Sequence, residues 1–226
     1  MRFGAVGYLN ARPLTEGLAP LVLDTPAGLA RRYGKGELDV ALLPVVAGHE
    51  LGLARVGSLG IAADGPVESV LLFLRTPLEA VRTLALDPAS RTSNVLARIV
   101  LREAHGARPE VREAPADAEV SIGDPALARS RGNEPRLDLS EAWRRHTGLP
   151  FVFAAWYGAP AAETALEEAY ARGRRRIAAY AAEARVDLGP ERLERYLETS
   201  IRYRIGAREE QGLARFLDAG RRLGLL

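Results

Sequence analysis

The chain has no cysteine among its 226 residues, which excludes disulfides, thiolate nucleophiles and cysteine-based zinc sites. Only three histidines occur, His49, His105 and His146, and no two of them have the spacing of a metal-binding pair. Lys35 is the single lysine. These absences predict a protein that holds no metal ion.

Long hydrophobic runs are also missing. A membrane span needs roughly 18 consecutive apolar residues, and the best candidate is interrupted by Pro150, Gly158 and Pro160. The sequence passes directly from Met1 into a strand-like segment, so no secretory signal is predicted. We therefore expect a cytoplasmic protein without a membrane partner.

Neither sign of charge is in large excess, because the net charge is only +2. Arginines are mixed with glutamates, as in residues 172–176 beside Glu167 and Glu168, and such runs are typical of solvated helix faces. We expect no nucleic-acid partner. An apolar content of 47% with 27% charged residues is that of a globular protein, and nothing in the sequence indicates its oligomeric state.

Short apolar segments alternate with helical patterns along the first two thirds of the chain. The expected strands are residues 3–6, 21–23, 38–43, 69–74, 83–87, 119–122 and 149–156. The expected helices are 26–34, 92–104 and 139–148, with only helices beyond residue 163 and a loop at 57–66. Continuous rather than alternating hydrophobicity at 38–43 favours strands covered on both faces, which predicts an α/β protein with mainly parallel sheets.

Two strong strands, 69–74 and 150–156, bracket a middle block with its own strands and helices. This arrangement predicts two lobes separated by a cleft, with residues 1–74 and 151–226 forming one lobe and 75–150 inserted as the other. The same periodicity also fits a single doubly wound sheet.

The loop Ser90-Arg91-Thr92-Ser93 joins three hydroxyls and a guanidinium to the start of a helix. The free N–H groups and positive dipole end of that helix favour a carboxylate or phosphate ligand. The alternative is ordinary N-capping by Ser90 or Thr92, which needs one hydroxyl.

A second candidate loop, Tyr8-Leu9-Asn10, ends the first strand and lies opposite the Ser90 loop in a bilobed arrangement. Arg12 either contacts a ligand carboxylate or lies on the surface. Ser69 opens a proposed crossover strand. Its hydroxyl either faces the cleft, has a capping role or is exposed to solvent. Asp124 hydrogen-bonds either the ligand or a backbone amide at the hinge.

Several segments, in matching order, resemble those of chorismate dehydratases, which open the futalosine route to menaquinone. They are residues 7–14 (GYLNARPL), 39–46 (DVALLPVV), 69–73 (SVLLF), 90–93 (SRTS), 122–127 (IGDPAL), and Trp143 with 147–156 (TGLPFVFAAW). The resemblance implies a bilobed type II periplasmic-binding-protein-like fold. It also implies a hydro-lyase that needs no cofactor.

The implied reaction removes water from chorismate to give 3-[(1-carboxyvinyl)oxy]benzoate. The ring carboxylate acidifies the hydrogen at C3 through the C1–C2 double bond, and the C4 hydroxyl then leaves. No general base stands out in the sequence, and the enolpyruvyl carboxylate of the substrate is a candidate for that role. The expected catalytic residues are Asn10 and Ser90, and the expected substrate-binding residues are Tyr8, Arg12, Ser69, Arg91, Thr92, Ser93 and Asp124, with a hinge role favoured for Asp124.

Alternatives from other classes remain at this stage. A non-catalytic binding protein for a small organic anion has the same architecture. The dihydroxynaphthoate synthase of the same route shares the fold, but its Ser-Pro-Cys-Pro-Asn-Asp type of motif is absent here, where Tyr8-Leu9-Asn10 stands. A ligand-sensing regulator needs a DNA-binding helix-turn-helix, and neither end of the chain shows one.

Overall fold

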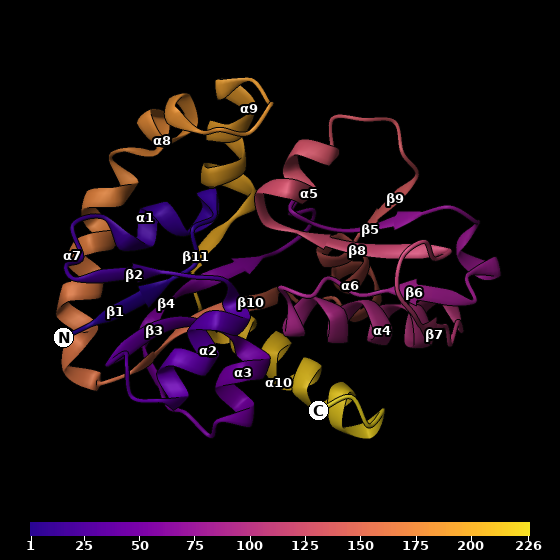
Figure 1. Ribbon diagram of the computed structural model, residues 1–226, viewed down its shortest axis with the longest axis horizontal. Coiled ribbons are helices and arrows are strands. Elements are labelled where there is room, and N and C mark those ends of the chain that lie inside the picture. The colour runs from indigo at the N-terminus through magenta and orange to yellow at the C-terminus, as the bar shows by residue number, and fades with distance from the viewer.

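The computed structural model describes residues 1–226 as two lobes side by side, each built on its own β-sheet (Figure 1). In lobe 1 the strand order is β11 (Arg202–Arg204), β4 (Arg55–Ala63), β10 (Phe151–Gly158), β3 (Val40–Pro44), β1 (Phe3–Ala5) and β2 (Leu21–Leu23). In lobe 2 it is β7 (Glu110–Val111), β6 (Thr83–Ala85), β8 (Ala118–Ile122), β5 (Val70–Leu74) and β9 (Arg136–Asp138).

Both sheets are mixed, so the expectation of mainly parallel sheets is wrong, although the α/β class is confirmed. β1 runs parallel to β2 and β3, and β6 runs parallel to β7 and β8, whereas the other pairs are antiparallel. All five residues of β3 are buried. Burial on both faces produces a continuous hydrophobic run whichever way the neighbouring strand points, so the run carries no information on strand direction.

Helices cover both sheets (Figure 1). Lobe 1 carries η1 (Leu9–Ala11), α1 (Arg12–Thr15), α2 (Pro26–Gly34), α3 (Val45–Glu50), η3 (Pro160–Ala162), α7 (Glu163–Arg174), α8 (Ile177–Glu183), α9 (Pro190–Arg195) and the π-helical turn η4 (Tyr196–Ser200). Lobe 2 carries η2 (Leu78–Ala80), α4 (Arg91–His105), α5 (Gly123–Arg129) and α6 (Leu139–Thr147). The C-terminal helix α10 (Ala207–Arg222) contacts β10 of lobe 1 and α4 of lobe 2. No helix combines the length and apolar character needed to cross a membrane.

The chain crosses between the lobes at residues 64–69 and returns at 148–150. The expected boundary at residue 74 therefore needs correction, because β5 pairs with β8 and β9 inside the sheet of lobe 2. A buried apolar strand has the same composition in either sheet, and only its pairing partners reveal to which lobe it belongs.

The expected loop at residues 57–66 is also wrong, since most of it belongs to the nine-residue strand β4. Gly60 allows close packing between strands, because a Cβ there would lie 2.5 Å from the carbonyl oxygen of Ala154 in β10. A second omission is β11, which lies in the C-terminal part expected to be helical only. A strand of three residues is too short to produce a periodic pattern.

Aromatic packing joins the return crossover to the C-terminal helix. Trp143 of α6 meets Phe151 of β10 and Phe216 of α10 edge to face, at centroid distances of 5.6 and 6.2 Å. The Trp143 indole N–H donates to the carbonyl oxygen of Pro150 at 3.2 Å. The cluster fixes the end of α6 against lobe 1 at the point where the chain returns.

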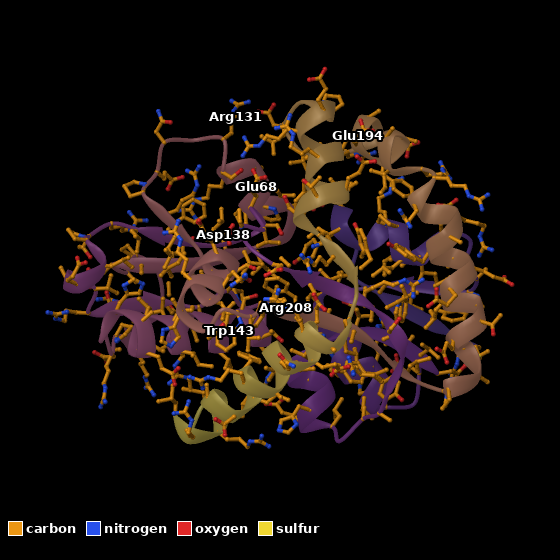
Figure 2. All side chains as sticks on the ribbon, turned by 180° about the vertical axis from the view of Figure 1, so that it is seen from behind. Glu68, Arg131, Asp138, Trp143, Glu194 and Arg208 are labelled. Atoms are coloured by element: carbon orange, nitrogen blue, oxygen red, sulfur yellow. The ribbon has the colours of Figure 1, made fainter.

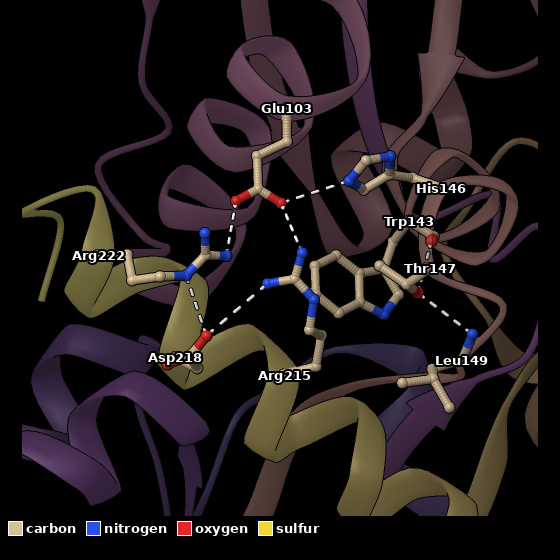
Figure 3. A network of polar contacts seen from close by, with 8 residues as sticks. All are labelled: Glu103, Trp143, His146, Thr147, Leu149, Arg215, Asp218 and Arg222. Atoms are coloured by element: carbon tan, nitrogen blue, oxygen red, sulfur yellow. Dashed lines mark hydrogen bonds and ion pairs between the residues drawn. The ribbon is translucent and has the colours of Figure 1, made fainter.

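A polar network lies on the outer side of this cluster (Figure 3). Glu103 of α4 accepts hydrogen bonds from Arg215 at 3.0 Å and from Arg222 at 2.9 Å, both on α10. Its carboxylate also lies 3.3 Å from Nε2 of His146 on α6. This network attaches the C-terminal helix to lobe 2.

Candidate active site

A pocket with a cavity volume of about 70 Å³ lies between the lobes. Its lining comes from lobe 1 (Val6, Tyr8, Asn10, Pro26, Leu42, Pro44, Ile61, Phe153 and Ala154), from the first crossover and the start of β5 (Val67, Ser69 and Val70) and from lobe 2 (Ser90, Thr92, Ser93, Ile122 and Gly123). Segments distant in sequence thus meet where the first strands of lobe 1 end and α4 of lobe 2 begins.

The N-terminus of α4 forms the wall from lobe 2. Ser90 is the N-cap residue, and its hydroxyl oxygen accepts the N–H of Ser93 at 3.1 Å. Ser90, Thr92 and Ser93 are all buried and all line the pocket. Capping and ligand binding are compatible here, because the Ser90 hydroxyl accepts from the backbone while its own hydrogen remains a donor. Three hydroxyls and the positive end of a 15-residue helix therefore face one space.

Two hydrogen bonds cross the cleft from backbone N–H groups of lobe 1 to side chains of lobe 2. The Thr92 hydroxyl oxygen accepts the N–H of Val46, in the first turn of α3, at 3.3 Å. Asp124 accepts the N–H of Leu9 at 3.0 Å. Burial raises the pKa of the Asp124 carboxyl, and the bond from Leu9 acts in the opposite direction. Asp124 does not line the pocket; it binds the backbone of the Tyr8-Leu9-Asn10 loop.

Tyr8 lies against the turn between β8 and α5. Gly123 in that turn has φ of +64°, and a Cβ there would approach the Tyr8 ring to 2.9 Å. Burial raises the pKa of Tyr8, and the nearby Asp87 and Asp124 carboxylates raise it further. Tyr8 is therefore a neutral phenol in the pocket at neutral pH.

Asn10 and Ser69 also line the pocket, and Ser69 contacts a buried tyrosine. Tyr196, in the π-helical turn η4, donates its hydroxyl hydrogen to Oγ of Ser69 at 2.9 Å. Asn10 is 9% exposed, and its Oδ1 has no hydrogen-bond partner in the protein. An unpartnered buried acceptor is costly unless a ligand or water supplies the donor.

The crossover segment that carries Ser69 is held in an unusual conformation. Glu68 has φ of +61°, the only positive value in the chain outside glycine. The backbone N–H groups of Val67 and Glu68 both donate to Asp138, at 2.9 and 2.7 Å, and Figure 2 shows Glu68 and Asp138 together near the middle of the molecule. Arg192 of α9 binds the Glu68 carboxylate at 2.7 Å. The backbone entering Ser69 is therefore fixed from both sides.

The structure brings together Tyr8, Asn10, Ser69, Ser90, Thr92 and Ser93 of the residues expected from the sequence. It does not bring Arg12 or Arg91 to the pocket. Arg12 binds Glu183 at 2.6 Å and stacks over the ring of Tyr180. Arg91 forms an exposed ion pair with Glu50, because a side chain in the first turn of a helix points around the axis from its neighbours.

Sequence reasoning missed the apolar wall and Tyr196. Leu42, Pro44 and Phe153 lie inside the segments that carry the family resemblance, but apolar residues there fit equally well as core. Tyr196 belongs to an apolar helix face, and only its hydroxyl hinted at another role. None of the 17 lining residues is Asp, Glu, His, Lys or Arg. The pocket thus offers hydrogen-bond donors for an anion beside an apolar surface.

Residues 1–222 match the family described as menaquinone biosynthesis. The chain belongs to this family. It is 31% identical to the chorismate dehydratase of Thermus thermophilus, over 96% of this chain and 93% of that protein. It is 28% identical to the chorismate dehydratase of Campylobacter jejuni, over 100% of both chains. The resemblance found in the sequence is confirmed.

Solved structures confirm the bilobed fold of this menaquinone biosynthesis family member. A protein from Archaeoglobus fulgidus matches with a TM-score of 0.78 at 14% identity, covering 100% of this chain and 98% of that one. The periplasmic aliphatic sulphonate binding protein of Escherichia coli matches with a TM-score of 0.63 at 17% identity, covering 100% and 88%. At these identities the likeness concerns the fold alone.

Proposed function

We propose that this protein is a chorismate dehydratase, a hydro-lyase that converts chorismate to 3-[(1-carboxyvinyl)oxy]benzoate in menaquinone biosynthesis. The observation that carries the proposal is its similarity, along the whole chain, to two curated chorismate dehydratases. The pocket supports it, because a helix N-terminus with three hydroxyls faces an apolar wall. Chorismate combines a ring with carboxylates. We place the reaction in the cytoplasm, with no nucleic-acid partner.

In the proposed complex the ring carboxylate binds at the start of α4. The hydroxyls of Ser90, Thr92 and Ser93 donate to it, together with N–H groups of the first turn that have no helical partner. The ring lies against the apolar side chains of the opposite wall, among them Leu42, Ile61 and Phe153. Tyr8, as a neutral phenol, adds a further donor without adding charge.

The chemistry follows from where negative charge develops. The C3–H bond breaks and its proton passes to the enolpyruvyl carboxylate of the substrate, since no lining residue is a carboxylate or histidine. The electron pair spreads through the C1–C2 double bond into the ring carboxylate, where the donors of α4 stabilise it. The pair then forms the C3–C4 double bond as the C4–O bond breaks, and the leaving hydroxide takes the proton from the enolpyruvyl carboxylate and departs as water. The ring becomes aromatic.

Asn10 and Ser90 have the leading roles in this proposal. Ser90 stabilises the carboxylate that gains charge, and the free Oδ1 of Asn10 holds the C4 hydroxyl that leaves. Removing a group that acts only on the transition state lowers kcat and kcat/KM together. We expect N10A and S90A each to reduce kcat/KM by tenfold or more.

The test is to mix the purified protein with chorismate and follow the ultraviolet spectrum and the product mass for loss of one water. Arg175→Ala, an exposed change outside the pocket, serves as the control and should keep wild-type activity. Loss of no water with the wild-type protein would remove the proposal. If N10A and S90A both stayed within about threefold of wild type, the assignment of roles would be wrong.

A non-catalytic binding protein is the second candidate. It is favoured by the fold, which this chain shares with the sulphonate binding protein, and by a pocket without titratable groups apart from Tyr8. In that case chorismate would raise the melting temperature but remain unconsumed after long incubation. The same sample therefore decides between the two functions.

A further inference from the structure

The hydroxyl of Tyr196 lies at the base of the pocket wall formed by Asn10 and Ser69. Tyr196 is 1% exposed and does not itself line the pocket, so it has no access to a ligand. Its hydroxyl donates to Oγ of Ser69 at 2.9 Å. Any influence on a bound molecule must therefore pass through its neighbours.

The direction of this hydrogen bond decides what Ser69 can do. A serine hydroxyl has one hydrogen to donate and lone pairs to accept with. Because Tyr196 donates to Ser69, the hydrogen of Ser69 is left for another acceptor, and Ser69 lines the pocket. Ser69 is thereby set as a donor toward the ligand.

Asn10 completes the arrangement from the other side. Burial raises the pKa of the Tyr196 phenol, and the neighbouring Ser69 and Asn10 side chains act in the opposite direction. The Tyr196 hydrogen is already used on Ser69, so the Asn10 group that suits the phenol oxygen is the N–H. This orientation leaves Oδ1, which is buried and has no protein partner, as the free acceptor of the amide.

An acceptor from Asn10 beside a donor from Ser69 is the complement of one hydroxyl group, which donates once and accepts as well. Resting on the proposed function, we propose that Tyr196 is a positioning residue that orients Ser69 and Asn10 to hold the departing C4 hydroxyl of the substrate. Asn10 Oδ1 accepts the hydroxyl hydrogen, and Ser69 donates to the oxygen as negative charge grows on it.

The local backbone supports this role. Tyr196 opens a π-helical turn, a departure from the α-helix that is frequent at functional sites. One turn earlier, Arg192 binds the carboxylate of Glu68. Residues 192 and 196 are four apart and lie on one face of the helix, where they contact the successive residues Glu68 and Ser69. The segment α9–η4 thus fixes both the strained backbone and the hydroxyl of the crossover.

The test compares Tyr196→Phe with Tyr203→Phe. Tyr203 is a matched control, because it is also buried but its hydroxyl has no hydrogen-bond partner and it does not line the pocket. Y196F should lower kcat about tenfold with KM changed less than about threefold, the effect of one lost hydrogen bond in the transition state. Y203F should keep wild-type kcat.

A double-mutant cycle separates positioning from mere packing. Ser69→Ala removes one of the two groups that Tyr196 orients, so S69A should also lower kcat, and the loss in the S69A/Y196F double variant should be smaller than the product of the two single losses. Multiplicative losses, or S69A with wild-type kcat, would overturn the inference even if Y196F folded poorly. Wild-type protein that does not consume chorismate would instead refute the proposed function.

Discussion

The contact between Gly123 and Tyr8 leads to a quantitative prediction. Gly123→Ala introduces two costs at once: a non-glycine residue at φ of +64°, and a methyl group 2.9 Å from the Tyr8 ring. The left-handed conformation costs about 1–2 kcal/mol. Crowding a packed site adds about 1–3 kcal/mol. We therefore expect G123A to lower the free energy of unfolding by about 2–5 kcal/mol.

Gly106 supplies the matched control for this change. It has φ of +65° and no atom within 4 Å of an added Cβ, so G106A reports the backbone cost alone. In a Tyr8→Ala background the crowding disappears, and G123A should then cost only about 1–2 kcal/mol, as G106A does. Urea unfolding of the five proteins of these comparisons (wild type, G123A, G106A, Y8A and Y8A with G123A) gives the values. Equal costs of G123A and G106A in the wild-type background would refute the reasoning.

Three further predictions concern the cap, the pH dependence and the aromatic cluster. S90A should lower the free energy of unfolding by about 1 kcal/mol and S90G by a few tenths, since glycine is tolerated as an N-cap. Both variants lack the hydroxyl, so calorimetry should show that they weaken chorismate binding equally. Unequal binding would argue against a role for the hydroxyl. Burial raises the pKa of Tyr8, no other lining residue titrates, and burial raises the pKa of Asp138, which holds the crossover, to about 6. We therefore expect kcat/KM to stay flat from about pH 7 to 9, and an inflection in that range would reveal a titrating group elsewhere. W143A should lower the free energy of unfolding, measured in urea, by about 3–5 kcal/mol, because the indole is fully buried between α6, β10 and α10. A decrease of less than about 2 kcal/mol would contradict this account of the cluster.

The sequence was informative where local chemistry decides the structure. Ser90 before an amphipathic run predicted the start of α4, and Gly148 predicted the end of α6, where it has the left-handed φ of +75°. It was uninformative where long-range pairing decides. Nothing local distinguishes a strand of lobe 1 from one of lobe 2, as β5 illustrates. Gly60 of β4 favoured the expected loop, because the backbone that it accommodates, that of Ala154, lies 94 positions away along the sequence.

The residues of the site were likewise predictable where local sequence decides, and not where a distant partner decides. Hydroxyls concentrated at a helix start identified Ser90, Thr92 and Ser93 as one wall. Arg91 lies within the same motif but faces away toward Glu50, since helical geometry separates neighbouring side chains by about 100°. Tyr196 was beyond reach, because its role depends on which residue its hydroxyl meets, and Ser69 is 127 positions away.

The discontinuity of lobe 1 affects the order in which the two lobes form on the ribosome. All strands of lobe 2 lie between residues 70 and 138, so its sheet is complete once that stretch has emerged. The sheet of lobe 1 must wait for β10 and β11, and until then β4 has no partner and β3 has an open edge. Unpaired apolar strands associate readily with other chains. During synthesis the vulnerable part of this protein is therefore its N-terminal lobe, although that lobe emerges first.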